Sequence, residues 1–199
     1  MAAVKAADCC CGMGDSIVLD PYDIYQMNKH LGVKFEELLN HKISLHAEEG
    51  LILPNLKMQG KEDGCAFLNE EGRCTIHAFR PGFCRLFPLG RIYEDGSFSY
   101  YLQSQECTKA NRTKVKVNKW LGIPDLKQYE NFVNEWHYFL KDTKALLLRL
   151  SDARLNQELS MYLLNRFYTT AFDLESDFYK QFDERMTQMK KLIYTLDRQ

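Results

Sequence analysis

The segment Cys65–Pro88 reads CAFLNEEGRCTIHAFRPGFCRLFP and carries three cysteines within twenty residues. Each of these cysteines follows a glycine by one or two residues. Glycine adopts backbone angles that other residues avoid, so turns at these points can aim several thiols at one centre. A metal ion needs such convergence, because its sulfur ligands lie at ~2.3 Å. The glycine–cysteine pairs are Gly64 and Cys65, Gly72 and Cys74, and Gly82 and Cys84.

Four more cysteines lie outside this segment, and the total of seven cannot be fully paired in disulfides. A single free cysteine is best interpreted as a small buried apolar residue. Three in one short segment, with a further triplet near the N-terminus, favour metal binding instead. The expected metal ligands are therefore Cys9, Cys10, Cys11, Cys65, Cys74, Cys84 and Cys107.

The N-terminal triplet is limited by backbone geometry. Neighbouring side chains of an extended chain point to opposite faces, so Cys9 and Cys11 share one side and Cys10 faces the other. We expect the triplet to supply two ligands to one centre, or to serve two centres. His77, three residues after Cys74, is a candidate nitrogen ligand for zinc, although a lone histidine is more often a surface residue.

The identity of the metal is left open by the ligand count. Paired C-x-x-C motifs, the strongest sequence signature of zinc, do not occur in the chain. A site rich in thiols and poor in histidine suits either an iron–sulfur cluster or an all-sulfur zinc centre. We favour an iron–sulfur cluster, because seven cysteines exceed the four ligands of one tetrahedral zinc ion.

Composition indicates which partners and which cellular compartment to expect. The formal net charge is −1, so no global field favours nucleic acid or an anionic membrane as a partner. The longest apolar run, Ala145–Leu150, is far shorter than the ~20 residues that span a bilayer. Residues Met1–Asp8 show no secretion signal. We expect a cytoplasmic protein with reduced thiols.

The fold class expected is α+β, with two regions that differ in composition and in predicted secondary structure. Residues 1–110 hold all the cysteines and ten of the eleven glycines, and they predict a small metal-binding domain of short strands and helices. Residues 111–199 predict a helical region that packs on this domain, since apolar residues recur there at helical spacing. The three apolar series begin at Leu126, Leu155 and Phe178.

Local signals predict the elements of the first region. Asp20-Pro21 starts a helix that Gly32 ends, because aspartate caps free amides and glycine allows a left-handed stop. The aspartates Asp20 and Asp23 are explained by this capping. Further expectations are a helix over Phe35–His41, an extended segment over Leu51–Met58, two strands around the turn 69–72, and a hairpin around the turn 94–97.

Three arginines surround the central cysteines. Arg73 precedes Cys74, while Arg80 and Arg85 flank Cys84. Guanidinium groups in such positions either clamp a carboxylate or phosphate, or neutralise thiolates and nearby acidic side chains. The sequence leaves both roles open.

The motifs as a whole resemble a known family. The opening Cys9-Cys10 with Gly12-Met13-Gly14 is followed by C-x-F-L, G-x-C-x-I and R-P-x-x-C-R-x-F-P runs within residues 65–88. This arrangement is similar to the YkgJ-type cysteine-cluster family, denoted CxxCxxCC, over residues 8–110. One departure is that Asp8 precedes a bare triplet, where the family usually has spaced cysteines.

The resemblance implies a domain that chelates zinc or iron. The family includes proteins resembling flagellin lysine N-methylases, so it also implies protein-lysine methylation with S-adenosylmethionine as an alternative. A third alternative is a structural metal site that holds loops for a protein partner. The residues themselves assign no catalytic side chain, and no glycine-rich nucleotide fingerprint is present.

Overall fold

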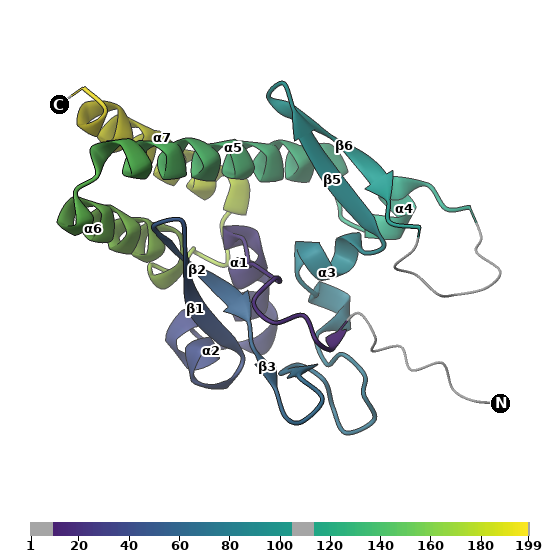
Figure 1. Ribbon diagram of the computed structural model, residues 1–199. Helices are drawn as coiled ribbons and strands as arrows, with labels where there is room; N and C mark the ends of the chain where they lie inside the picture. The colour runs from purple at the N-terminus through teal and green to yellow at the C-terminus, as the bar shows by residue number, and fades with distance from the viewer. Residues whose placement is uncertain (1–9, 105–113, 199) are drawn as a thin grey trace.

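The computed structural model describes residues 10–104 and 114–198. It is an α+β arrangement in which the long helices lie at the top and left of the view, one strand pair lies at the upper right beside them, and the other strand pairs lie below (Figure 1). The helical C-terminal region and the α+β class are as the sequence predicts. Among the described helices, none is both long and apolar enough to cross a bilayer.

The first two helices follow their local signals. Helix α1 (Pro21–Leu31) begins with a reciprocal cap, in which the Asp20 carboxylate accepts from the Asp23 amide at 2.9 Å and the Asp23 carboxylate accepts from the Asp20 amide at 3.1 Å. Gly32 ends the helix with a left-handed φ of 68°. Helix α2 (Phe35–His41) has the expected bounds.

The strand pair next in the chain forms part of the core. Strand β1 (Ile43–Glu48) pairs antiparallel with β2 (Leu51–Leu56), and nearly every residue of β2 is buried. The expected extended segment is confirmed as β2 and the start of β3 (Met58–Gln59), whereas β1 was not expected. Helix α6 (Ala153–Leu164) packs on β2, where the Ser160 hydroxyl accepts from the Ile52 amide at 2.7 Å.

The cysteine-rich segment is more irregular than the sequence predicts. Strand β4 (Gly64–Cys65) pairs with β3, and the turn at 69–72 is present. The prediction of two strands around this turn, Cys65–Leu68 and Arg73–His77, is wrong, because β4 ends at Cys65 and a single bridge joins Leu68 to Cys74. Beyond that bridge the chain enters a 3-10 turn, η2 (His77–Phe79), and then helix α3 (Gly82–Leu86).

The expected hairpin is confirmed as β5 (Leu89–Glu94) and β6 (Ser97–Leu102). Its turn residues Asp95 and Gly96 both have positive φ, at 50° and 76°, which matches the right-handed twist of the strands. The turn rests on the long helix α5 (Leu126–Leu150), where Asn134 donates to the Gly96 carbonyl at 2.7 Å.

The remaining helices follow the three apolar series. After the short helix α4 (Val117–Leu121), the chain forms α5, α6, the π-helical turn η3 (Asn165–Thr169) and α7 (Phe178–Leu196). Helices α5 and α7 run side by side along one edge of the molecule (Figure 1).

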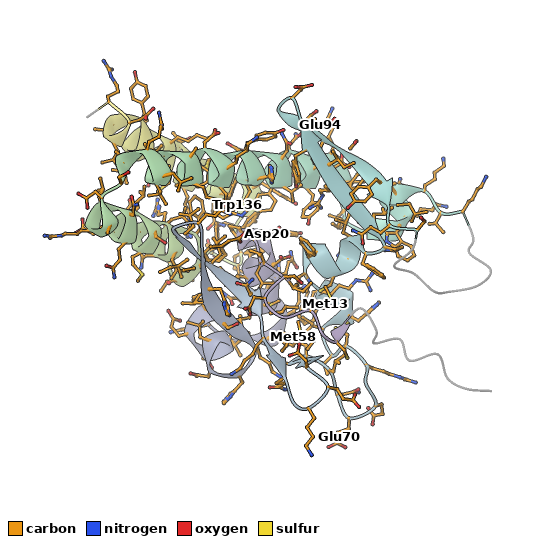
Figure 2. The ribbon with its side chains drawn as sticks, viewed as in Figure 1. Met13, Asp20, Met58, Glu70, Glu94 and Trp136 are labelled. Atoms are coloured by element: carbon orange, nitrogen blue, oxygen red, sulfur yellow. The ribbon has the colours of Figure 1, made fainter. Side chains whose placement is uncertain are left out.

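One core contains residues from both regions of the chain. Tyr22 of α1 lies within 5.0 Å of Phe178 in α7, measured between ring centroids, and Phe132 of α5 lies within 4.7 Å of Phe182. Asp20 and Trp136 lie near the middle of the molecule, whereas Glu70 and Glu94 mark outer turns (Figure 2). The division into two domains near residue 110 stays a prediction.

Candidate metal centre

Five of the seven expected metal ligands lie in the described residues. These are Cys10, Cys11, Cys65, Cys74 and Cys84. Cys9 and Cys107 fall outside the described residues.

Cys65 lies at the centre of the thiol group. It ends strand β4 opposite Met58 and is only 8% exposed. The backbone amide of Phe67, two residues later, lies near its sulfur and lowers the pKa of the Cys65 thiol, although burial raises that pKa more. An amide in this position favours the thiolate, which is the form that binds metal. The C-x-F sequence therefore builds a turn that supports a sulfur ligand.

Cys74 and Cys11 lie close enough to Cys65 to act on its ionisation. Burial raises the pKa of the Cys65 thiol, and negative charge on Cys74 or Cys11 raises it further. Cys74 is held by its bridge to Leu68. Cys11 is held by a bridge to Gly64, where a Cβ atom would lie 4.0 Å from the Cys11 sulfur. Thiols from two other segments thus lie near the Cys65 thiol.

A lysine beside this group was not expected from the sequence. The Lys42 ammonium donates to the Ala66 carbonyl at 2.7 Å and lies 5.2 Å from the centroid of the Phe67 ring. Its charge lowers the pKa of Cys65. Lys42 follows helix α2 and reaches the site only through the pairing of distant segments, so no local sequence signal identifies it.

Cys10 and Cys84 are partly buried against the hydrophobic core. Cys84 lies in the middle of helix α3, between Gly82 and Arg85. Within residues 10–104 and 114–198, no three histidine, cysteine, aspartate or glutamate side chains stand in an arrangement that holds a metal ion. The chemistry of the Cys11, Cys65 and Cys74 donor set fits a soft metal, and a bound centre requires these sulfurs to draw closer together.

His77, the candidate nitrogen ligand, lies against an arginine. Its Nε2 atom contacts Arg80 Nη1. Burial lowers the pKa of His77, and the charges of Arg80 and Arg85 lower it further. The ring is therefore neutral at pH 7 and has a guanidinium group as its neighbour.

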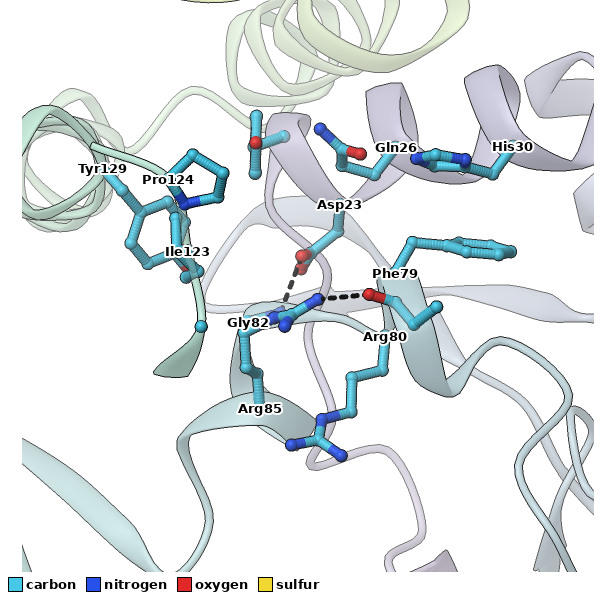
Figure 3. A pocket seen from close by; sticks show the side chains of 13 residues that line it. Asp23, Gln26, His30, Phe79, Arg80, Gly82, Arg85, Ile123, Pro124 and Tyr129 are labelled. Carbon is cyan, nitrogen blue, oxygen red and sulfur yellow. Dashed lines mark hydrogen bonds between the residues drawn. The ribbon is translucent and has the colours of Figure 1, made fainter. Parts of the chain in front are cut away.

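Asp23 connects helix α1 to the cysteine-rich segment. Besides capping its own helix, it accepts from the Gly82 amide at 2.8 Å (Figure 3). Burial raises the pKa of Asp23 to about 6, although hydrogen bonds from Gly82 and Asp20 and the charges of Arg91 and Arg85 lower it. Sequence reasoning explained Asp23 as a cap and missed this second bond, which joins residues far apart in the chain.

One of the comparisons with known proteins gives a match, and it covers the cysteine-rich part of the chain. The family model CxxCxxCC, described as "Putative zinc- or iron-chelating domain", matches residues 5–119. That match spans more than half of the 199 residues and contains all seven cysteines. No curated protein and no solved structure matches the chain. The chain therefore belongs to the CxxCxxCC family of zinc- or iron-chelating domains.

Proposed function

We propose that the chain binds an iron–sulfur cluster or zinc, with Cys11, Cys65 and Cys74 as the central ligands. The observation that supports this most is that Cys11 and Cys74, from separate segments, both lie close enough to the buried Cys65 thiol to raise its pKa. Cys84 and the remaining cysteines are the proposed sources of further ligands. The family to which the chain belongs supports the same class of function.

Charge balance supports a metal at this place. Several thiolates close together repel one another, and burial penalises each negative charge. A divalent metal or an iron–sulfur cluster would supply the compensating positive charge and, for a cluster, a redox couple. Lys42 and the Phe67 amide would then act on the ligand sulfurs from outside, and such contacts tune metal affinity and reduction potential.

We favour an iron–sulfur cluster over zinc on the number of thiols. Seven cysteines are more than one tetrahedral zinc ion uses. Protein-lysine methylation, which the family resemblance implies, and a purely structural zinc module remain the alternative proposals.

Anaerobic purification with metal and sulfide analysis tests the proposal. We expect iron and acid-labile sulfide in matching amounts together with a brown visible spectrum. Stoichiometric zinc in a colourless protein would support metal binding and reject the cluster. Protein that carries neither metal and takes up neither on reconstitution would reject the proposal.

Two variants locate the ligands. Cys65→Ser should remove most of the bound metal, because it deletes the central sulfur. The control Ala66→Ser introduces the same hydroxyl at the adjacent residue, which is also buried, and should keep the metal. Equal metal loss in both variants would show that the polar substitution, and not the sulfur, is responsible.

Chelation separates the alternatives. A structural module predicts that metal removal unfolds residues 1–110, which circular dichroism detects. A methylase predicts saturable binding of S-adenosylmethionine by the metal-loaded protein. A redox module predicts a reversible one-electron wave and no such binding.

A further inference from the structure

The short helix α4 presents a cationic and aromatic side to solvent. Lys116, Lys119 and Trp120 are three and four residues apart, so their side chains share one side of the helix. All three are exposed, and Trp120 is 41% exposed although its Nε1 atom donates to the Leu86 carbonyl at 3.4 Å. The opposite side carries Leu121, which is 1% exposed. Packing therefore holds α4 through Leu121 and leaves the lysines and the indole ring uncovered.

Exposed apolar side chains lie near this side of the helix. Val115, just before α4, is 50% exposed, and Leu102 at the end of β6 is 55% exposed. Leu102 pairs with Leu89, three residues after the Leu86 whose carbonyl binds Trp120. Figure 1 shows α4 beside the end of β6. We name this surface the α4 patch, and it consists of Leu102, Lys114, Val115, Lys116, Lys119 and Trp120.

Two segments that pack together at the patch contain no acidic residue. Residues 73–93 and 114–124 hold seven lysines and arginines and no aspartate or glutamate, whereas the whole chain has a formal net charge of −1. The Arg85 guanidinium joins the segments by donating to the Leu121 carbonyl at 3.1 Å. Lys114, Lys116 and Lys119 form no ion pair with any residue that the structure describes. The patch therefore has a local positive charge that the overall composition does not show.

The shape of the patch favours an extended surface as its partner. Two cavities, of about 260 Å³ beside α1 and about 360 Å³ beside α2, are lined by none of its residues. Small molecules and helical peptides bind in clefts or grooves, and single-stranded nucleic acid stacks on several rings, whereas the patch has one. A layer of lipid headgroups requires neither, because lysines attract anionic lipids and tryptophan is favoured at the membrane–water interface.

We propose that the α4 patch binds the surface of a bilayer that contains anionic phospholipids. The side chains of Trp120, Val115 and Leu102 enter the headgroup region, and the three lysines lie at the level of the lipid phosphates. The patch contains none of the cysteines proposed as ligands, so this binding is independent of the metal centre. The structural alternative is that the lysines only keep α4 hydrated.

Sedimentation of the full chain with lipid vesicles tests the proposal. The probes are vesicles of phosphatidylcholine with ~30% phosphatidylserine and vesicles of phosphatidylcholine alone. We expect about half of the protein to bind the anionic vesicles at a lipid concentration on the order of 1 mM in ~0.1 M salt, and little to bind at ~0.5 M salt. Phosphatidylcholine alone should bind at least ~10-fold more weakly.

Tryptophan fluorescence places the lipid at the patch. The chain has two tryptophans, and Trp136 is only 5% exposed, so a blue shift on adding anionic vesicles reports on Trp120. The variant Trp120→Ser should lose the blue shift and bind the anionic vesicles about tenfold more weakly, because a half-exposed indole no longer enters the headgroups.

Two triple variants test the charge. Replacement of all three patch lysines by glutamine should weaken binding ~100-fold, since each lysine near an anionic surface contributes about fivefold. The control makes the same change in net charge at three exposed lysines outside the patch and should weaken binding less than ~3-fold. The patch variant is Lys114→Gln/Lys116→Gln/Lys119→Gln, and the control is Lys34→Gln/Lys61→Gln/Lys191→Gln.

Several results would overturn the proposal: no binding of the wild type to anionic vesicles, equal binding to phosphatidylcholine alone, or equal losses in the two triple variants. Binding of a single-stranded oligonucleotide without binding of vesicles would assign the patch to nucleic acid and overturn it as well. Circular dichroism checks that each variant is folded, and all the substituted side chains are exposed. Metal content is measured in the same samples, so failure of this proposal is distinguishable from failure of the metal proposal.

Discussion

Gly82 has almost no room for a side chain, and Gly82→Ala is therefore a sharp test of the structure. A Cβ atom at this position would lie 2.1 Å from the Tyr129 hydroxyl and 3.4 Å from the ring carbon that bears it. Tyr129 is only 1% exposed, so its ring has little freedom to move away. One of the two groups must shift.

The expected loss of stability follows from two opposing effects. Overpacking a rigid core site costs ~1–3 kcal/mol, and a contact this short belongs at the upper end. Alanine has a higher helix propensity than glycine, and at a helical position this increases the free energy of unfolding by at most ~1 kcal/mol. The net destabilisation is about 2 kcal/mol, and with a urea m value of ~2 kcal/mol/M it lowers the midpoint by about 1 M.

Two further variants identify the cause. Tyr129→Phe removes the hydroxyl and leaves the ring carbon at 3.4 Å, so Gly82→Ala should be nearly harmless in that background. Gly90→Ala is the matched control. Its Cβ would lie 2.3 Å from the Tyr101 ring, but Tyr101 is 42% exposed and can turn into solvent. We expect less than ~1 kcal/mol of destabilisation there.

Urea unfolding followed by circular dichroism measures the free energy of unfolding of the wild type, of Gly82→Ala, of Tyr129→Phe and of the double variant. The metal content of each protein is measured as well. Unfolding of Gly82→Ala at the wild-type midpoint, or an effect of Gly82→Ala that Tyr129→Phe does not suppress, would contradict a clash between these two residues. A destabilisation by Gly90→Ala as large as that by Gly82→Ala would contradict it as well.

The remaining predictions concern charges in the interior. Because burial raises the folded-state pKa of Asp23 from 3.8 to about 6, the folded state holds this proton more tightly than the unfolded state. The stability that Asp23 contributes is therefore full below pH ~4 and falls by up to about 3 kcal/mol as the pH rises through 6. Urea unfolding of Asp23→Asn should show a smaller fall, because the neighbouring Asp20 remains and burial raises its pKa as well. The hairpin-turn variant Asp95→Asn should keep the whole fall, and parallel profiles of Asp23→Asn and wild type would contradict the assignment. Arg185 is 8% exposed and donates to the carbonyls of Arg166, Thr170 and Ala171, so Arg185→Met should destabilise by ~2–4 kcal/mol in thermal or urea unfolding. The control Arg154→Met changes a fully exposed arginine and should unfold like the wild type. An equal loss of stability in Arg185→Met and Arg154→Met would rule out the buried contacts as the cause.

Elements with local causes could be predicted from the sequence. The start and end of α1 depend on Asp20 and Gly32, which act within one helical turn. The β5–β6 hairpin depends on Asp95 and Gly96, which alone supply the positive φ angles of its turn. Strand β1 reads ISLHAE and alternates apolar and polar residues throughout, so this strand was missed although its sequence carries the ordinary signal of a strand with one buried face.

The candidate site was predicted only in its residue types. Glycine-flanked cysteines show that turns can aim thiols inward, but they do not show which thiols meet. The structure brings Cys11, Cys65 and Cys74 together and adds Lys42, which acts across 24 residues of sequence through its bond to Ala66. The position of Gly82 beside helix α1 likewise depends on its bond to Asp23, across 59 residues.

The sequence by itself determined the helix caps, the hairpin turn, the apolar helix faces and the chemistry of the ligands, because each depends on residues a few positions apart. Only the tertiary structure decided which sulfurs are neighbours, which cation stands beside them, and that Asp23 accepts a hydrogen bond from Gly82. The physical reason is that these contacts join distant segments. Their geometry is set by strand pairing and core packing, which no short stretch of sequence contains.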